Sequence, residues 1–194
     1  MGICESISNK QETQNNQFIK SSFLISKEPS INIPLNIENK LRSSICNISY
    51  NKNNNIKKGT GFFIQLNDYK CLMTNYIELP QELIDKFIVI KIYNNKSIKI
   101  QLNEIYTKFY NALNMTIIEL NDLNTINYII NDIYFLDYNS DYNKGYEQYL
   151  NTEIFIFQYP RDSIEVSKGT IRQILNANKF KYNITNVSSG APII

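Results

Sequence analysis

Short apolar runs separated by turn residues fill the chain from residue 31 onward. Over residues 98–102 apolar and polar side chains alternate, which is typical of a strand with one buried face. Such runs predict seven strands before residue 121, over Ser44–Tyr50, Thr60–Leu66, Lys70–Asn75, Ile88–Tyr93, Ser97–Leu102, Ile105–Tyr110 and Met115–Leu120. Seven strands at this short spacing indicate an all-β fold, an antiparallel barrel or sandwich, and not a sheet of alternating strands and helices.

The pattern changes twice along the chain. Residues 80–87 predict a short helix, with Pro80 near its first turn. After Leu120 a polar connector suggests a boundary, and four further strands follow, over Ile133–Leu136, Glu153–Gln158, Ser167–Leu175 and Lys179–Ile184. We therefore expect three parts: a flexible tether over 1–40, a first β-barrel over 41–122 and a partial second β-barrel over 123–194.

The first six residues fit the pattern for N-myristoylation. Removal of Met1 would expose Gly2, and Ser6 occupies the favoured position. Cys4 lies beside them and is a candidate for palmitoylation, and two acyl chains anchor a protein where one binds only marginally. The alternative is that a Met-Gly start followed by serine arises by chance. Lipidation at Gly2 and Cys4 predicts a location on the cytoplasmic face of a membrane.

Composition excludes several kinds of site. The 20 basic and 18 acidic residues are well mixed and form no basic stripe, so we expect no nucleic-acid partner. Three widely spaced cysteines and no histidine predict neither a disulfide framework nor a metal site, and no cofactor motif is present. These features favour an intracellular, reducing compartment. The 29 asparagines indicate a compositional bias.

Three segments, in order, resemble the motifs of the trypsin-like serine peptidase family, which has the chymotrypsin fold. They are Gly59-Thr60-Gly61-Phe62-Phe63-Ile64 with Cys71-Leu72-Met73-Thr74-Asn75-Tyr76-Ile77, then Asn114-Met115-Thr116-Ile117-Ile118-Glu119-Leu120, then Ser188-Ser189-Gly190-Ala191-Pro192. The resemblance covers residues 41–194 and implies a chymotrypsin-like double β-barrel.

The resemblance also assigns positions in the catalytic site, and most of them are changed. The nucleophile position is Ser189, which is retained. The general base falls on Ile77, which carries no proton, and the orienting aspartate falls on Asn114. In the oxyanion loop Val187 replaces a glycine before Ser188. The family continues well beyond its serine, which implies that the second barrel is incomplete here and has an open sheet edge.

Three interpretations follow. The first is a catalytically inactive protease homologue that binds a protein or peptide at a degenerate cleft or an open sheet edge. The second is a residual serine endopeptidase in which Ser189 uses a base other than histidine, with Lys58 and Lys168 as candidates. The third is a chance resemblance on a different all-β fold, in which Ile77, Asn114 and Ser189 would lie far apart.

Overall fold

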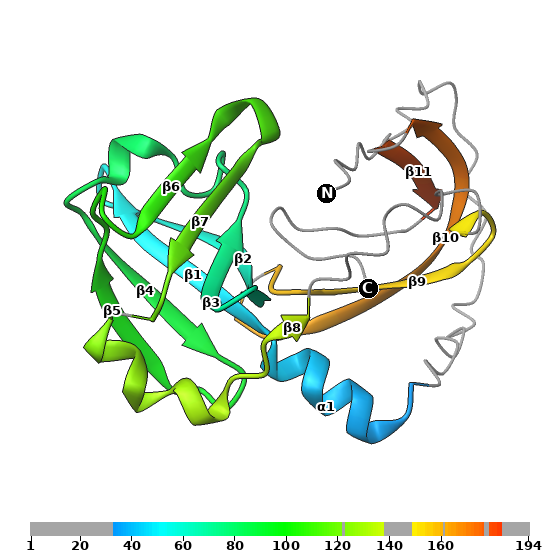
Figure 1. Ribbon diagram of the computed structural model, residues 1–194, viewed down its shortest axis with the longest axis horizontal. Helices are drawn as coiled ribbons and strands as arrows, with labels where there is room; N and C mark the ends of the chain where they lie inside the picture. Colours follow the sequence, from blue (N-terminus) through cyan, green and yellow to red (C-terminus); the bar gives the residue numbers. More distant parts are fainter. Residues whose placement is uncertain (1–32, 122, 138–148, 161, 177–178, 184–194) are drawn as a thin grey trace, which may run out of the picture.

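The computed structural model describes residues 33–121, 123–137, 149–160, 162–176 and 179–183. Most of the first half forms one antiparallel sheet that curls into a half-barrel, on the left of Figure 1. Its main strands are β1 (Ile45–Lys52), β2 (Asn55–Leu66), β3 (Tyr69–Thr74), β4 (Phe87–Ile92), β5 (Ser97–Gln101), β6 (Thr107–Tyr110) and β7 (Met115–Glu119). Their order is β5-β4-β1-β2-β3-β7-β6. All seven strands predicted before residue 121 are therefore confirmed.

The inside of the curl is filled by aliphatic side chains at alternate strand positions. Phe63, Leu72 and Ile118, from three neighbouring strands, are fully buried there. Gly61 allows this packing, because a Cβ at that position would lie 2.6 Å from Ile48 Cδ1 and 2.8 Å from Leu72 Cδ1. Such distances are shorter than any van der Waals contact, so any larger residue at position 61 would force the Ile48 and Leu72 side chains to move.

A second antiparallel sheet follows, on the right of Figure 1. It consists of β9 (Glu153–Gln158), β10 (Glu165–Asn176) and β11 (Lys179–Asn183), in the order β11-β10-β9. All three correspond to predicted strands. The remaining prediction, over residues 133–136, is largely wrong, because only the two-residue strand β8 (Leu136–Asp137) forms, parallel to β2. β1 begins opposite Phe62, which leaves the end of β2 open for β8.

The connector between the sheets belongs to the first core. It forms two 3₁₀ turns, η3 (Asn124–Tyr128) and η4 (Ile130–Asp132), and buries Ile126 and Ile129 among the barrel side chains. The boundary expected after residue 122 therefore falls before the last segment that packs on the first sheet. Sequence pattern missed this because the apolar residues of a 3₁₀ turn follow neither the helix nor the strand period.

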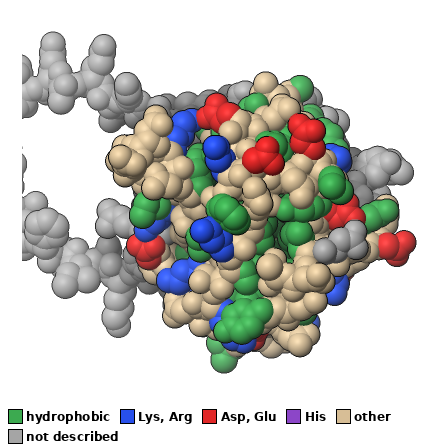
Figure 2. All heavy atoms as spheres, turned by 90° about the vertical axis from the view of Figure 1, so that its left-hand side faces the viewer, with side chains coloured by type: hydrophobic (Ala, Val, Ile, Leu, Met, Phe, Trp, Pro, Cys, Tyr) green, Lys and Arg blue, Asp and Glu red, His purple; other side chains and the backbone are tan. Residues whose placement is uncertain are grey.

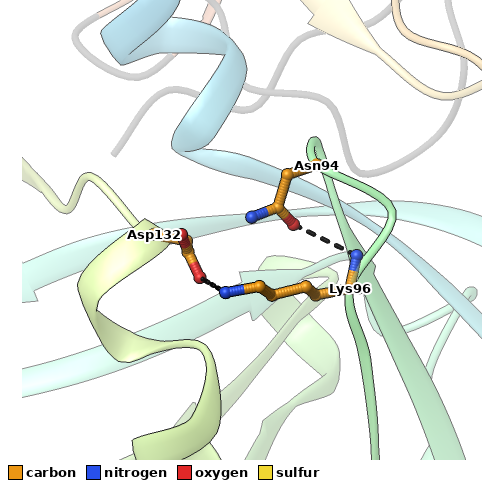
Figure 3. A network of polar contacts seen from close by, with 3 residues as sticks. All are labelled: Asn94, Lys96 and Asp132. Carbon is orange, nitrogen blue, oxygen red and sulfur yellow. Dashed lines mark hydrogen bonds and ion pairs between the residues drawn. The ribbon is translucent and has the colours of Figure 1, made fainter.

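A polar network fixes η4 to the hairpin between β4 and β5 (Figure 3). Lys96 Nζ donates to Asp132 Oδ2 at 2.6 Å, and the Lys96 backbone N–H donates to Asn94 Oδ1 at 3.1 Å. The hydrogen bond from Lys96 is the main reason that the pKa of Asp132 is lowered. Because these side chains are exposed, the ion pair mainly sets the position of the connector and adds little stability.

The prediction of a helix over residues 80–87 is wrong. Only one 3₁₀ turn forms, η1 (Gln81–Leu83), and β4 begins at Phe87. Asp85 N–H donates to Leu102 O at 2.8 Å, and Leu102 N–H donates to Lys86 O at 2.9 Å. Pairing with the end of β5 therefore takes these residues out of any helix, and the spacing of Leu83 and Phe87 only imitates a helical pattern.

Helix α1 (Leu35–Ser43) was not predicted and begins within the segment expected to be a tether. Pro34 precedes its first turn, and Arg42 pairs with Glu38 at 2.6 Å. Leu41 is buried against Ile45 of β1 and the aromatic side chains of β9 and the following turn. The helix therefore covers the junction of the two sheets, and its anchoring depends on contacts distant in sequence.

One buried threonine joins the two sheets. The Tyr159 backbone N–H, directly after β9, donates to Thr60 Oγ1 at 2.9 Å, and Thr74 Oγ1 donates to Thr60 O at 2.9 Å. Thr60 is fully buried, so these polar groups have no access to water. The Thr60 side chain of β2 therefore accepts the hydrogen bond from the first backbone N–H after β9.

We predict opposite outcomes for the same substitution at two buried threonines. Thr60→Val should lower the free energy of unfolding by about 1–3 kcal/mol, because the Tyr159 N–H loses its acceptor. Thr107→Val should leave it unchanged or raise it, because the buried Thr107 hydroxyl has no hydrogen-bond partner in the described structure. Urea denaturation of both variants measures the difference, and equal effects would contradict the assignment.

Candidate functional site

Ile77 lies in a tight turn directly after β3. Glu78 N–H and Leu79 N–H both donate to Asn75 O at 3.1 Å, which winds residues 75–79 into a helical turn. The Ile77 side chain points out of this turn and is 71% exposed. The position that the family resemblance assigns to the general base is thus occupied by an isoleucine open to solvent.

Asn114 lies against this turn. It follows the 3₁₀ turn η2 (Asn111–Leu113), directly before β7, with φ 47° and ψ 49°. Asparagine tolerates this left-handed conformation better than most residues. Its Oδ1 accepts a hydrogen bond from the Ile77 backbone N–H at 3.1 Å. The structure therefore brings together the two positions that the resemblance assigns to the base and its orienting group.

Two further contacts fix these segments relative to each other. Thr116 Oγ1, from β7, donates to Leu79 O at 2.7 Å and is buried. The rings of Tyr76 and Phe109 meet edge to face, with their centroids 6.2 Å apart. β3 and β7 also pair through Thr74 and Thr116, directly before the Ile77 turn. The turn is therefore fixed to β7 by this pairing and to Phe109 through the Tyr76 ring.

Apolar side chains are exposed near the Ile77 turn. Tyr110 and Leu113 are exposed, and each lies close to Asn114 in the chain. Residues 73–77 and 109–118 contain no charged side chain, and Glu78 is the next residue of the turn. Sequence analysis identified Ile77 and Asn114 but missed Tyr110 and Leu113, whose alternation with polar residues is that of an ordinary strand and turn. Neither an isoleucine nor an amide side chain can act as a general base.

The two lysines considered as alternative bases are exposed and paired with carboxylates. Lys58 Nζ lies 2.6 Å from Asp162 Oδ1, and Lys168 Nζ lies 2.6 Å from Glu153 Oε1. The hydrogen bond from Lys58 is the main cause of the lowered pKa of Asp162. A lysine acts as a base when it is buried or crowded by other cations, and neither condition holds for these two.

The described cysteines are not nucleophiles. Cys46 and Cys71 are buried free thiols. Burial, and secondarily Glu119, raises the pKa of Cys71 to about 11, and burial raises the pKa of Cys46 as well. A protonated thiol neither attacks nor binds metal. Among the described residues no three His, Cys, Asp or Glu side chains are grouped to hold a metal ion.

The other predicted site residues lie outside the described residues. These are the nucleophile position, the oxyanion loop and the acylation positions, namely Ser189, Val187, Ser188, Gly2 and Cys4. Their assigned roles stay predictions. No helix in the described part of the chain has the length and apolar character needed to cross a membrane.

The curled sheet, the second sheet and the β3–β7 site together define a class of fold, that of the chymotrypsin-like serine proteases. Among solved structures, a serine endoprotease from Yersinia pestis matches with a TM-score of 0.57 and 12% identity, over 84% of this chain and 54% of that one. This chain therefore spans about half the length of that protein.

Two further structures agree with this fold. Deg5 matches with a TM-score of 0.52 and 11% identity, over 84% of this chain and 82% of that one. An inactive serine-to-alanine mutant of Rv3671c from M. tuberculosis H37Rv matches with a TM-score of 0.52 and 14% identity, over 84% and 79%. No family model and no curated protein sequence matches this chain. The resemblance seen in the sequence is thus confirmed for the fold.

The contact between Ile77 and Asn114 leads to a prediction that uses the absence of histidine. Ile77→His introduces the only imidazole in the chain, so its NMR titration has no competing signal. In Ile77→His/Asn114→Asp the imidazole pKa should be higher by about 1 than in Ile77→His alone, because a carboxylate at position 114 stabilises the imidazolium.

Asn95 provides the matched control for this titration. It is exposed, lies in the β4–β5 hairpin and shares the left-handed backbone of Asn114. Ile77→His/Asn95→Asp carries the same net charge and should titrate like Ile77→His. Equal pKa values in the two double variants would show that position 114 does not face position 77.

Proposed function

We propose that this chain is a non-catalytic homologue of the chymotrypsin-fold serine proteases that binds a protein or peptide partner. The observation that carries the proposal is the pairing of Ile77 with Asn114 in a chain without histidine. A serine nucleophile needs a neighbouring group that takes its proton and returns it to the leaving group. Isoleucine has no such group, and the amide of asparagine has no charge with which to stabilise a protonated base.

The surface around Ile77 supports a binding role. Ile77, Tyr110 and Leu113 expose apolar side chains at the place where the resemblance locates the substrate cleft. Covering them would release water from apolar surface, so a partner with apolar side chains fits this surface best.

The second candidate function is a residual hydrolase in which Ser189 acts with a lysine base. Retention of serine at the nucleophile position favours it. Against it, Lys58 and Lys168 are both exposed and hydrogen-bonded to carboxylates, whereas a lysine base is buried or crowded by other cations. The non-catalytic function therefore agrees better with the described side chains.

Activity-based labelling distinguishes the two functions. Incubation with a fluorophosphonate probe should give no more labelling of the wild-type chain than of Ser189→Ala, because an unactivated serine reacts very slowly. Trypsin at the same concentration serves as the positive control. Labelling of the wild type that disappears in Ser189→Ala would refute the proposal, and its further loss in Lys58→Ala or Lys168→Ala would identify the base.

The proposal includes N-terminal acylation, on the strength of the sequence around Gly2 and Cys4. Cells expressing the full chain and fed alkyne-myristate should label the wild type and Cys4→Ser but not Gly2→Ala. Hydroxylamine-sensitive palmitate should be lost in Cys4→Ser, since the thioester requires that thiol. Equal myristate labelling of the wild type and Gly2→Ala would contradict acylation at Gly2.

A further inference from the structure

Four neighbouring strands of the first sheet carry one sign of charge. Strands β2, β1, β4 and β5 contain five lysines and no aspartate or glutamate. The lysines are well separated in sequence, so the chain as a whole, with a net charge of +2, gives no sign of their grouping. The sheet order places these four strands side by side.

The strand register places three of these lysines on the outer face of the sheet. Lys58, Ser49, Val89 and Lys99 lie opposite one another and form one row across the four strands. Lys91 lies in the adjacent row, opposite Ser97. Val89, Lys91 and Lys99 alternate with buried isoleucines that point inward, so these three side chains lie on the outer face. With strands about 4.8 Å apart, the row spans about 14 Å.

Exposed apolar side chains lie between these lysines. Ile56 is 68% exposed and Phe87 is 52% exposed, and the outward Val89 is also exposed. Lys99 Nζ lies 4.4 Å from the centre of the Phe87 ring, so the ammonium group and the ring form a cation–π contact. Figure 2 shows the molecule from the side of β5, where hydrophobic, basic and acidic side chains lie interspersed.

The acidic side chain of Asp162 borders this face. Asp162 pairs with Lys58, and Lys91 also contributes to lowering the pKa of its carboxyl. The pair neutralises Lys58 in part, whereas Lys91 and Lys99 have no carboxylate partner among the ion pairs of the described residues. These two lysines supply the free positive charge of the face.

We propose that this outer face of β2, β1, β4 and β5 docks on an anionic lipid membrane. Lysines attract the negative headgroups, while Ile56, Phe87 and Val89 enter the boundary between headgroups and acyl chains. Nucleic acid would pair with the lysines but would leave the aliphatic side chains exposed to water. An apolar peptide would cover the aliphatic side chains but would not pair with the lysines. The face therefore fits a partner that is anionic and apolar at once. This inference does not depend on the proposed loss of catalysis.

The docking face would also complete the membrane attachment expected from the N-terminus. A single myristoyl chain binds only marginally, and a second signal such as a basic patch makes the attachment stable. A face that acts in this way binds vesicles weakly on its own. The test therefore uses the full chain made in bacteria without an acyl group, so that only the protein surface contributes.

Vesicle sedimentation provides the test. The unacylated chain should bind vesicles of phosphatidylcholine with 30% phosphatidylserine and not vesicles of phosphatidylcholine alone, and binding should weaken as salt is raised. Lys91→Glu/Lys99→Glu should lower the partition coefficient at least tenfold. Lys40→Glu/Lys108→Glu makes the same change of net charge at exposed lysines of α1 and β6 and should retain most binding.

A second set of variants tests the apolar side chains of the docking face. Ile56→Ser/Phe87→Ser should weaken binding to the same anionic vesicles, whereas Ile105→Ser, at an even more exposed isoleucine outside the face, should not. Circular dichroism confirms that each variant is folded. Equal loss in the two lysine pairs, no preference for anionic vesicles, or binding to a single-stranded oligonucleotide in place of vesicles would overturn the proposal.

Discussion

The central part of strand β2, over residues 59–64, is largely buried on both faces, and the strand pairs with β1 along one edge and with β3 along the other. The rest of the fold depends on this constraint. The inward residues of β2, Gly61 and Phe63, close the barrel core. Its outward residues, Thr60 and Phe62, meet the turn after β9 and the side chains beneath α1. A strand in this position tolerates neither added volume on one side nor a lost acceptor on the other. The glycine-threonine-glycine sequence is therefore explained by packing and needs no catalytic role.

The local structure of the candidate site does not require a proton-transfer group at position 77. The hydrogen bond between the Ile77 backbone and Asn114 needs only an oxygen acceptor, which an amide provides as well as a carboxylate. A neutral hydrogen bond of this kind contributes about 1 kcal/mol whatever side chain residue 77 carries. The position of the turn is thus independent of the chemistry of the side chain at position 77.

Sequence alone predicted the strands well because β-branched and aromatic residues alternate with polar ones along them. It failed where tertiary contacts decide the conformation, as in the segment before Phe87, which pairs with the end of β5, and in α1, which docks through Leu41.

The excess of asparagine also has a structural consequence. Apart from Asp85, every described non-glycine residue with positive φ is an asparagine, namely Asn53, Asn54, Asn67, Asn95, Asn114 and Asn151. With only six glycines in the chain, asparagine takes over their usual place in turns.

The two surfaces for which we propose partners are carried by different strands. Ile77 and Asn114 lie beside β3 and β7, whereas Lys91 and Lys99 belong to β4 and β5. The net charge of +2 hides this arrangement, since lysines and carboxylates balance over the whole sequence while the four strands carry lysines alone. Local charge on a folded face, and not the total, decides which surfaces a protein approaches.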